Sequence, residues 1–249
     1  MRVPCFPVAT QTLIKGARTT RSTIALKLLM AGSGIVFILY VLVHMYGNLK
    51  AFGGEDSFNS YAHHLREFGE PLLPYEGLLW IIRVVLVVSL VVHVVAAYLL
   101  AQRARKQRPV KYAVKKHVGS SLSSRTMRWG GVTLLLFVIW HLLHFTIVKV
   151  NPAGDNSAQI TQNPYALMVS SFETWWMTVI YLLAMVALGF HLHHGTFSAL
   201  QTLGFTSTAS SRARARVLGW ILAIVIAGGF SLVPLFTLFG VIELPTHLQ

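Results

Sequence analysis

The sequence predicts an all-α integral membrane protein with five transmembrane helices. Hydrophobic residues make up 54% of the 249-residue chain and charged residues only 12%, about half the charged share of an average soluble domain. A hydrocarbon core roughly 30 Å thick requires about 20 apolar residues in a helix. Five nearly uncharged stretches reach that length, at residues 28–49, 78–101, 129–150, 174–200 and 218–242.

The distribution of charge predicts the orientation of these helices. Three stretches without any acidic residue, namely 1–27, 102–128 and 212–216, hold 17 of the 21 basic residues, and all eight acidic residues lie in the alternate connections and near the C-terminus. By the positive-inside rule the N-terminus is expected in the cytoplasm and the C-terminus outside. We therefore expect a basic tail at 1–27, a five-helix domain at 28–242 and a short outer tail at 243–249.

The net charge of +13 has two interpretations in such a protein. The basic connections set the orientation and contact anionic lipid headgroups, and a broad basic face also suits a soluble partner subunit. Residues 1–27 contain no apolar core of a secretory signal, so no cleavage is expected. The single cysteine, Cys5, excludes an internal disulfide and a site built from several thiolates.

Histidines occur in four of the five predicted spans. They are His44 in the first, His93 in the second, His141 and His144 in the third, and His191, His193 and His194 in the fourth. Ionisable side chains in membrane spans are rare, face the protein interior and mark functional paths. A lone histidine would usually be a hydrogen-bonded core residue, but four helices that each supply one predict a four-helix binding bundle with the fifth helix at its periphery.

The depths of these histidines group them into two levels. Helical rise places His44 roughly 8 Å, His141 roughly 13 Å and His144 roughly 9 Å from the outer ends of their helices. His93 and His191 lie roughly 12–14 Å from the inner ends. Two histidines on one haem iron fill both axial positions, which suits electron transfer and leaves no site for oxygen. The sequence thus predicts two b-type haems, whereas zinc would gather three or four ligands at one level.

Two further features accompany the histidines. Arg83 is the only charge well inside a span, where it is a candidate partner of a haem propionate or a side chain that reaches to the outer interface. Glycines in the histidine-bearing spans would let a flat macrocycle approach the backbone, or would simply allow close helix packing. These are Gly32, Gly34, Gly130, Gly131, Gly189 and Gly195.

Several motifs carry a family resemblance over residues 26–239. They are His44-Met-Tyr-Gly-Asn-Leu, Tyr61-Ala-His-His-Leu-Arg-Glu-Phe-Gly-Glu-Pro, Trp140-His-Leu-Leu-His, Gly189-Phe-His-Leu-His-His-Gly and Ser198-Ala-Leu-Gln-Thr-Leu-Gly. In their order and placement the chain resembles the dihaem cytochrome b membrane anchor of succinate dehydrogenase and fumarate reductase. The similarity is to the single-chain, five-helix kind that works mainly with menaquinone.

The resemblance implies a ligand set. His93 and His191 would bind the haem nearer the cytoplasm, and His44 and His141 the outer one. At the third span depth alone slightly favours His144, whereas the resemblance favours His141 because it directly follows Trp140. His193 and His194 would meet propionates, a neighbouring helix or water, and His144 and His194 stay candidates for cofactor contact.

The resemblance also implies partners and a location. A flavoprotein with FAD and an iron-sulfur subunit would dock on the cytoplasmic face of a prokaryotic plasma membrane, in a complex that can form a higher oligomer. The chain has no glycine-rich dinucleotide fingerprint and no cysteine cluster, so succinate chemistry is expected in those partners. This subunit would anchor them, conduct electrons and take part in quinone reduction.

A quinone pocket needs an apolar slot, hydrogen-bond partners and a proton route. Candidates on the outer side are Tyr61, His64, Arg66 and Glu67, in the connection between the first two spans. The alternative is an amphipathic interfacial helix with solvated charges. On the inner side, the start of the first span and residues 198–204 are a second possible location.

The sequence leaves other functions open. The chain could be the cytochrome b anchor of another respiratory complex, such as a formate dehydrogenase or hydrogenase. It could be an anchor without haem, or a transporter whose histidines relay protons. Transporters of this size usually contain inverted repeats, and no convincing internal repeat is found here.

Overall fold

A computed structural model of the chain describes residues 22–107, 122–152 and 154–248. Within these ranges all regular elements are helical, and five helices are long and apolar enough to cross a membrane. The predicted all-α fold with five spans is therefore confirmed. The expectations for Cys5, for the tail before residue 22 and for the basic residues at 108–121 lie outside the described residues.

The spanning helices extend beyond the predicted apolar stretches at their basic ends. They are α1 (Thr23–Leu49), α3 (Gly77–Lys106), α4 (Leu122–Leu142, continued by the π-helical turn η3 at Leu143–Ile147), α7 (Trp175–Thr202) and α8 (Ala209–Leu238). Charged residues can continue a helix once it has left the hydrocarbon region, because water and headgroups solvate them. Helix α8 ends four residues before the predicted boundary, and Gly240 follows with a φ of 68°, a conformation typical of helix termini.

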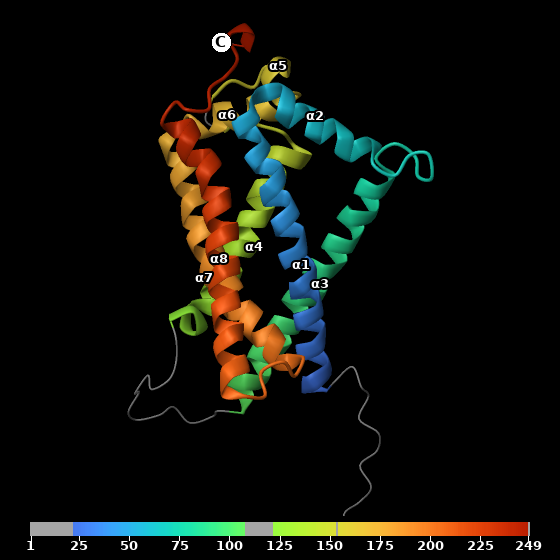
Figure 1. Ribbon diagram of the computed structural model, residues 1–249, viewed down its shortest axis with the longest axis vertical. Coiled ribbons are helices and arrows are strands. Elements are labelled where there is room, and N and C mark those ends of the chain that lie inside the picture. The colour runs from blue at the N-terminus through green and yellow to red at the C-terminus, as the bar shows by residue number, and fades with distance from the viewer. Residues whose placement is uncertain (1–21, 108–121, 153, 249) are drawn as a thin grey trace, which may run out of the picture.

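The remaining elements gather at one end of the bundle. They are η2 (Lys50–Gly53), α2 (Gly54–Glu67), α5 (Ala158–Thr161), α6 (Pro164–Phe172) and η4 (Thr246–Leu248). Figure 1 shows α2, α5, α6 and the C-terminus at the upper end, opposite the start of α1. Basic residues of the described chain, such as Arg103, Arg125 and Arg212, belong to helix ends at the other side.

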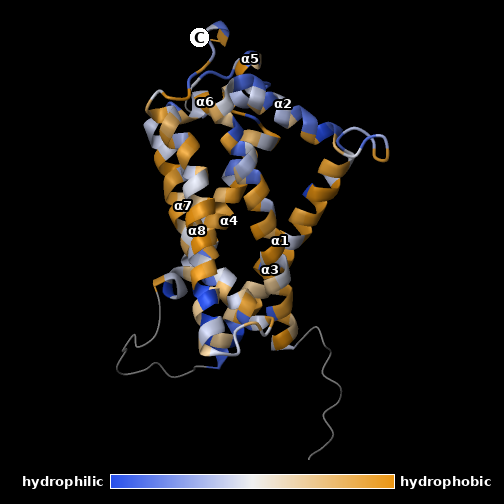
Figure 2. Cartoon of the chain, viewed as in Figure 1, coloured by the Kyte–Doolittle hydropathy of each residue, from blue (hydrophilic) through white to orange (hydrophobic). Residues whose placement is uncertain are grey.

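Helices α1, α7 and α8 form the centre of the bundle, with α4 packed on α7 and α3 packed on α1. Helix α3 crosses α1 and then leans away from it toward the upper end, where α2 bridges the two (Figure 1). Ala96 is the only fully buried residue of α3. Its many exposed valines and isoleucines suit contact with lipid, and Figure 2 shows the apolar residues along the spans.

The packing of α8 differs from the peripheral position that the sequence suggests. The helix supplies no histidine, yet it packs along α7 and contacts α1. Small residues explain this close approach. A Cβ atom built on Gly219 would lie 2.7 Å from the backbone oxygen of His193 in α7, and one built on Gly229 would overlap the side chain of Met45 in α1.

Substitution Gly219→Ala is expected to destabilise the protein by about 1–3 kcal/mol, because the added methyl group forces the backbones of α7 and α8 apart. Thermal denaturation of the purified complex in detergent measures the effect. The matched control is Gly228→Ala in the same helix, where an added Cβ meets nothing within 4 Å. Equal melting temperatures for the two variants would contradict the tight contact.

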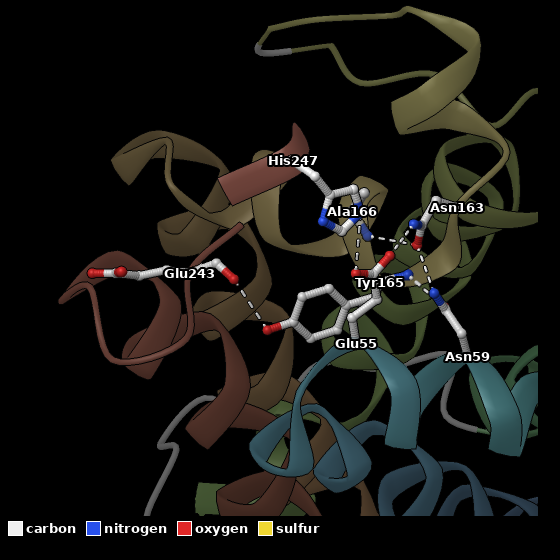
Figure 3. A network of polar contacts seen from close by, with 7 residues as sticks. All are labelled: Glu55, Asn59, Asn163, Tyr165, Ala166, Glu243 and His247. Atoms are coloured by element: carbon white, nitrogen blue, oxygen red, sulfur yellow. Dashed lines mark hydrogen bonds and ion pairs between the residues drawn. The ribbon is translucent and has the colours of Figure 1, made fainter. Parts of the chain in front are cut away.

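A polar network closes the end of the bundle that carries α2 and α6 (Figure 3). Asn163 caps α6 by accepting from the Ala166 amide at 3.1 Å, and its side chain also donates to Glu55 and accepts from Asn59. His247 lies 3.6 Å from the same Glu55 carboxylate. The network ties α2, α6 and the C-terminal segment together above the spans.

Tyr165 links this network to the apolar core beneath it. Its hydroxyl donates to the Glu243 carbonyl at 3.1 Å, and its ring packs with buried residues of α6, α7 and α8, including Val169, Met177 and Val233. Burial raises the pKa of Tyr165, with a further contribution from the charge of Glu55. Helix α6 is thus buried between the polar network and the apolar core.

Candidate functional site

The two histidines predicted to lie nearer the cytoplasm, called the inner pair below, meet across two helices. His93 of α3 and His191 of α7 have ring centroids 6.2 Å apart, with an interplanar angle of 53°. Both side chains are partly buried. The Nδ1 atom of His191 is buried and has no hydrogen-bond partner among the described residues. A buried polar atom without a partner is costly in a purely structural role, which favours a binding role for this pair.

The outer pair has nearly the same spacing. His44 of α1 and His141 of α4 have ring centroids 5.9 Å apart, at an interplanar angle of 77°. The His44 ring also stacks on Tyr40 and contacts Phe230 of α8. The structure therefore joins the same two pairs of helices that the sequence analysis paired by depth.

Both spacings fit one metal between two imidazoles. A metal to nitrogen bond of about 2 Å on each side places the two ring centres roughly 6 Å apart. Within the described residues no group of three or more His, Cys, Asp or Glu side chains could hold a metal ion. Two axial nitrogens suffice for a haem iron, because the macrocycle supplies the other four ligands.

The two pairs lie at different depths. Ser33, which contacts His93, and His44 are eleven residues apart along α1, so the levels are separated by roughly 16 Å along the helix. This places one site toward each end of the bundle, as the sequence predicts.

Small residues leave space at the inner pair. A Cβ atom on Gly34 would lie 3.6 Å from the His93 ring, and one on Gly131 would lie 3.7 Å from the His191 ring. A shallow, open hollow of about 320 Å³ lies beside Ser33 between α1 and α3, lined chiefly by leucines and valines. Of the other predicted glycines, Gly189 faces Ala227, while Gly32, Gly130 and Gly195 meet nothing within 4 Å.

His144 is engaged by the protein itself. It is only 1% exposed, with Nδ1 3.0 Å from the Tyr181 hydroxyl and Nε2 2.9 Å from the Ser171 hydroxyl. Iron coordination would have to break one of these hydrogen bonds. The geometry therefore favours His141 over His144 as the ligand from the third span.

The neighbours of His191 take different positions. His193 packs between helices: its Nδ1 lies 3.0 Å from the Ser123 hydroxyl of α4, and its ring stacks on Trp220 of α8 at 4.2 Å. This is the contact with a neighbouring helix that the sequence analysis considered. His194 is partly exposed, and its proposed cofactor contact stays a prediction.

Arg83 lies in a small charged group near the start of α3. Its Nη1 atom is 3.7 Å from Glu76, whose carboxylate also accepts from Arg66 at 3.1 Å. The Arg83 guanidinium stacks over the Trp80 ring at 4.8 Å. These contacts direct it to the interface, so its proposed contact with a propionate stays a prediction.

The four quinone candidates do not converge on one pocket. Tyr61 packs against Gly47 of α1, and Arg66 is held by Glu76. His64 and Glu67 are exposed, with His64 against Phe68 and Glu67 3.4 Å from His63. Helix α2 contains no fully buried residue, and it has the amphipathic character expected of an interfacial helix.

Comparison with known proteins identifies the class of this membrane subunit. Residues 101–231, just over half of the chain, match the family described as succinate dehydrogenase/fumarate reductase transmembrane subunit. The chain belongs to this family and is a membrane subunit of that kind of complex. The match includes His141 and His191, whereas His44 and His93 precede it. Searches of curated proteins and of solved structures give no match.

Proposed function

We propose that the chain is the cytochrome b membrane anchor of a succinate dehydrogenase and connects the iron-sulfur subunit with menaquinone. Two haems b would be held by His93 with His191 and by His44 with His141. The observation that carries this proposal is that the imidazole rings of each pair meet across two helices, with ring centroids 6.2 and 5.9 Å apart. Haem b, when bound, supplies one-electron transfer in either direction without a change of ligands.

The basic ends of the helices provide the docking face. Arg103, Arg105 and Lys106 end α3, and Arg125 and Arg128 lie in the first turns of α4. Together with Arg212, Arg214 and Arg216 of α8 they form a basic surface at one end of the bundle. This end faces the cytoplasm of a prokaryotic cell in our proposal, because positive charge is retained on that side, and it receives the iron-sulfur and FAD-containing subunits.

The opposite end handles menaquinone in this proposal. Tyr61, His64, Arg66 and Glu67 all belong to α2, which lies on the level of the outer interface. They do not converge on one pocket, but the exposed His64 imidazole can donate to a quinone carbonyl, and the exposed Glu67 carboxylate can exchange protons with water. The apolar residues exposed on α1 and α3 allow the quinone tail to reach this level from the lipid.

Measurement of haem in the purified complex tests the proposal. A pyridine haemochrome assay is expected to give two haems b per copy of this chain, and succinate is expected to reduce haem in the oxidised complex. A membrane extract from cells without the gene is the control. An intact complex without haem would leave only an anchor role and contradict the proposal.

A further inference from the structure

Each proposed haem site contains one histidine whose Nδ1 atom meets a hydroxyl group. At the outer site the Tyr181 hydroxyl lies 3.4 Å from Nδ1 of His141. At the inner site the Ser33 hydroxyl lies 3.1 Å from Nδ1 of His93. A hydroxyl can donate or accept, so the direction of each bond depends on where the hydroxyl proton goes.

At the outer site a backbone carbonyl determines which group donates in each of the linked hydrogen bonds. The Ser171 hydroxyl donates to the Leu167 carbonyl at 2.6 Å, so its oxygen accepts from Nε2–H of His144 at 2.9 Å. The Nδ1 atom of His144 then has no proton and accepts from the Tyr181 hydroxyl at 3.0 Å. A neutral imidazole carries one N–H, and a hydroxyl donates only one proton.

The last of these linked hydrogen bonds fixes the tautomer of His141. Because the Tyr181 proton is directed to His144, the Tyr181 oxygen accepts from Nδ1–H of His141. The remaining nitrogen of His141, Nε2, is therefore the one without a proton. An unprotonated imidazole nitrogen is the metal ligand.

At the inner site the tautomer of His93 is fixed in the same way, through fewer linked hydrogen bonds. The Ser33 hydroxyl donates within its own helix to the Leu29 carbonyl at 2.8 Å. Its oxygen is then an acceptor for Nδ1–H of His93, which leaves Nε2 of His93 without a proton. The opposing ligand at this site, His191, has a buried Nδ1 without a partner among the described residues.

We infer that Tyr181 and Ser33 are positioning residues, each of which fixes the tautomer of one axial histidine and tunes the potential of one haem. This inference rests on the proposed function. A hydrogen bond donated by the far N–H of a ligating imidazole makes the ligand more basic and orients its ring. A more basic ligand stabilises oxidised iron, so the intact bonds lower the potential.

The test is a spectroelectrochemical titration of the purified complex in its wild-type form and with Tyr181→Phe or Ser33→Ala. Tyr181→Phe is expected to raise the midpoint potential of the outer haem and to leave the inner one unchanged. Ser33→Ala is expected to raise the midpoint potential of the inner haem and to leave the outer one unchanged. Where the bond favours the oxidised state by the net energy of one ordinary hydrogen bond, its loss changes the reduction equilibrium roughly tenfold, which corresponds to about 59 mV for one electron.

Two control variants separate this effect from a general loss of stability on removal of a hydroxyl group. Tyr165→Phe removes a hydroxyl that donates to the Glu243 carbonyl, and Ser231→Ala removes one that donates to the Ala227 carbonyl within α8. Neither control is expected to shift a potential. The two titration waves are assigned from variants that lack one axial histidine.

The outcomes are distinct. Both haems present with neither potential shifted, or with both shifted equally in one variant, would overturn the inference and leave the proposed function intact. A wild-type complex without haem would instead overturn the proposed function. If Tyr181→Phe does not assemble, Ser33→Ala tests the same rule at the inner site by itself.

Discussion

Replacement of His93 by alanine is expected to remove one of the two haems, and replacement of His44 to remove the other. In the proposed function each haem would be held by histidines from two different helices, and the two pairs share no residue. Loss of one histidine would then leave the iron with a single bond to the protein. The haemochrome assay should fall from two haems per chain to one in each variant, with different haem absorption bands lost.

The catalytic consequence should be confined to the membrane side. Succinate-driven quinone reduction is expected to fall by about 100-fold or more, since removal of groups that merely support a metal ligand already costs 10–100-fold. Succinate oxidation with a soluble dye should persist, because the FAD-containing subunit is a separate chain. The dye assay therefore reports assembly, and the quinone assay reports the electron route.

The controls address histidine loss and failure to assemble. His247→Ala removes a histidine that is 65% exposed, at the end of the bundle that carries α2 and α6, and is expected to retain both haems. If the alanine variants do not assemble, His93→Met keeps a weaker axial ligand and should give two haems, one with a raised potential. Two unchanged haems in both alanine variants would exclude the proposed pairs.

The spans and the level of each histidine could be predicted from the sequence because both depend on local properties. Membrane length is fixed by the helical rise, and a histidine in an apolar run stands out by residue type alone. The spacing along α1 and α7 then places His44 and His191 at different depths. The structure adds the lateral contacts, which hydropathy does not encode.

The role of His144 could not be derived in this way. It is three residues from His141, so a regular helix would place both on similar faces. The structure changes to a π-helical turn at Leu143, where the Val148 amide bonds to the Leu143 carbonyl. His144 itself meets Ser171 and Tyr181, two residues from other helices, and the local sequence does not encode these contacts.

Helix α6 was also missing from the sequence-based prediction, although a local signal exists. Asn163 followed by Pro164 is a typical helix start, since Asn caps the first turn and Pro suits the first helical position. At nine residues the helix is too short to cross a membrane, so the length and hydropathy of the predicted spans do not indicate it. Its burial beneath the polar network depends on contacts with residues of α7 and α8, which are distant in sequence.

The separate roles of His141 and His144 lead to the second large expected effect. His141→Ala is expected to abolish the outer haem and leave the inner one. His144→Ala is expected to retain both haems, because both of its ring nitrogens are hydrogen-bonded to protein hydroxyl groups, one to Tyr181 and the other to Ser171. Difference spectra of the two purified complexes, with haem counted per chain, give the measurement.

The cost of His144→Ala should instead appear in stability. The substitution removes a buried side chain and leaves the hydroxyls of Tyr181 and Ser171 with one partner fewer, which costs about 2–5 kcal/mol. The melting temperature should therefore fall while the haem count stays at two. Loss of the outer haem in His144→Ala, with two haems retained in His141→Ala, would show that His144 is the ligand and that the hydrogen-bond chain from Leu167 to His141 is rearranged when haem binds.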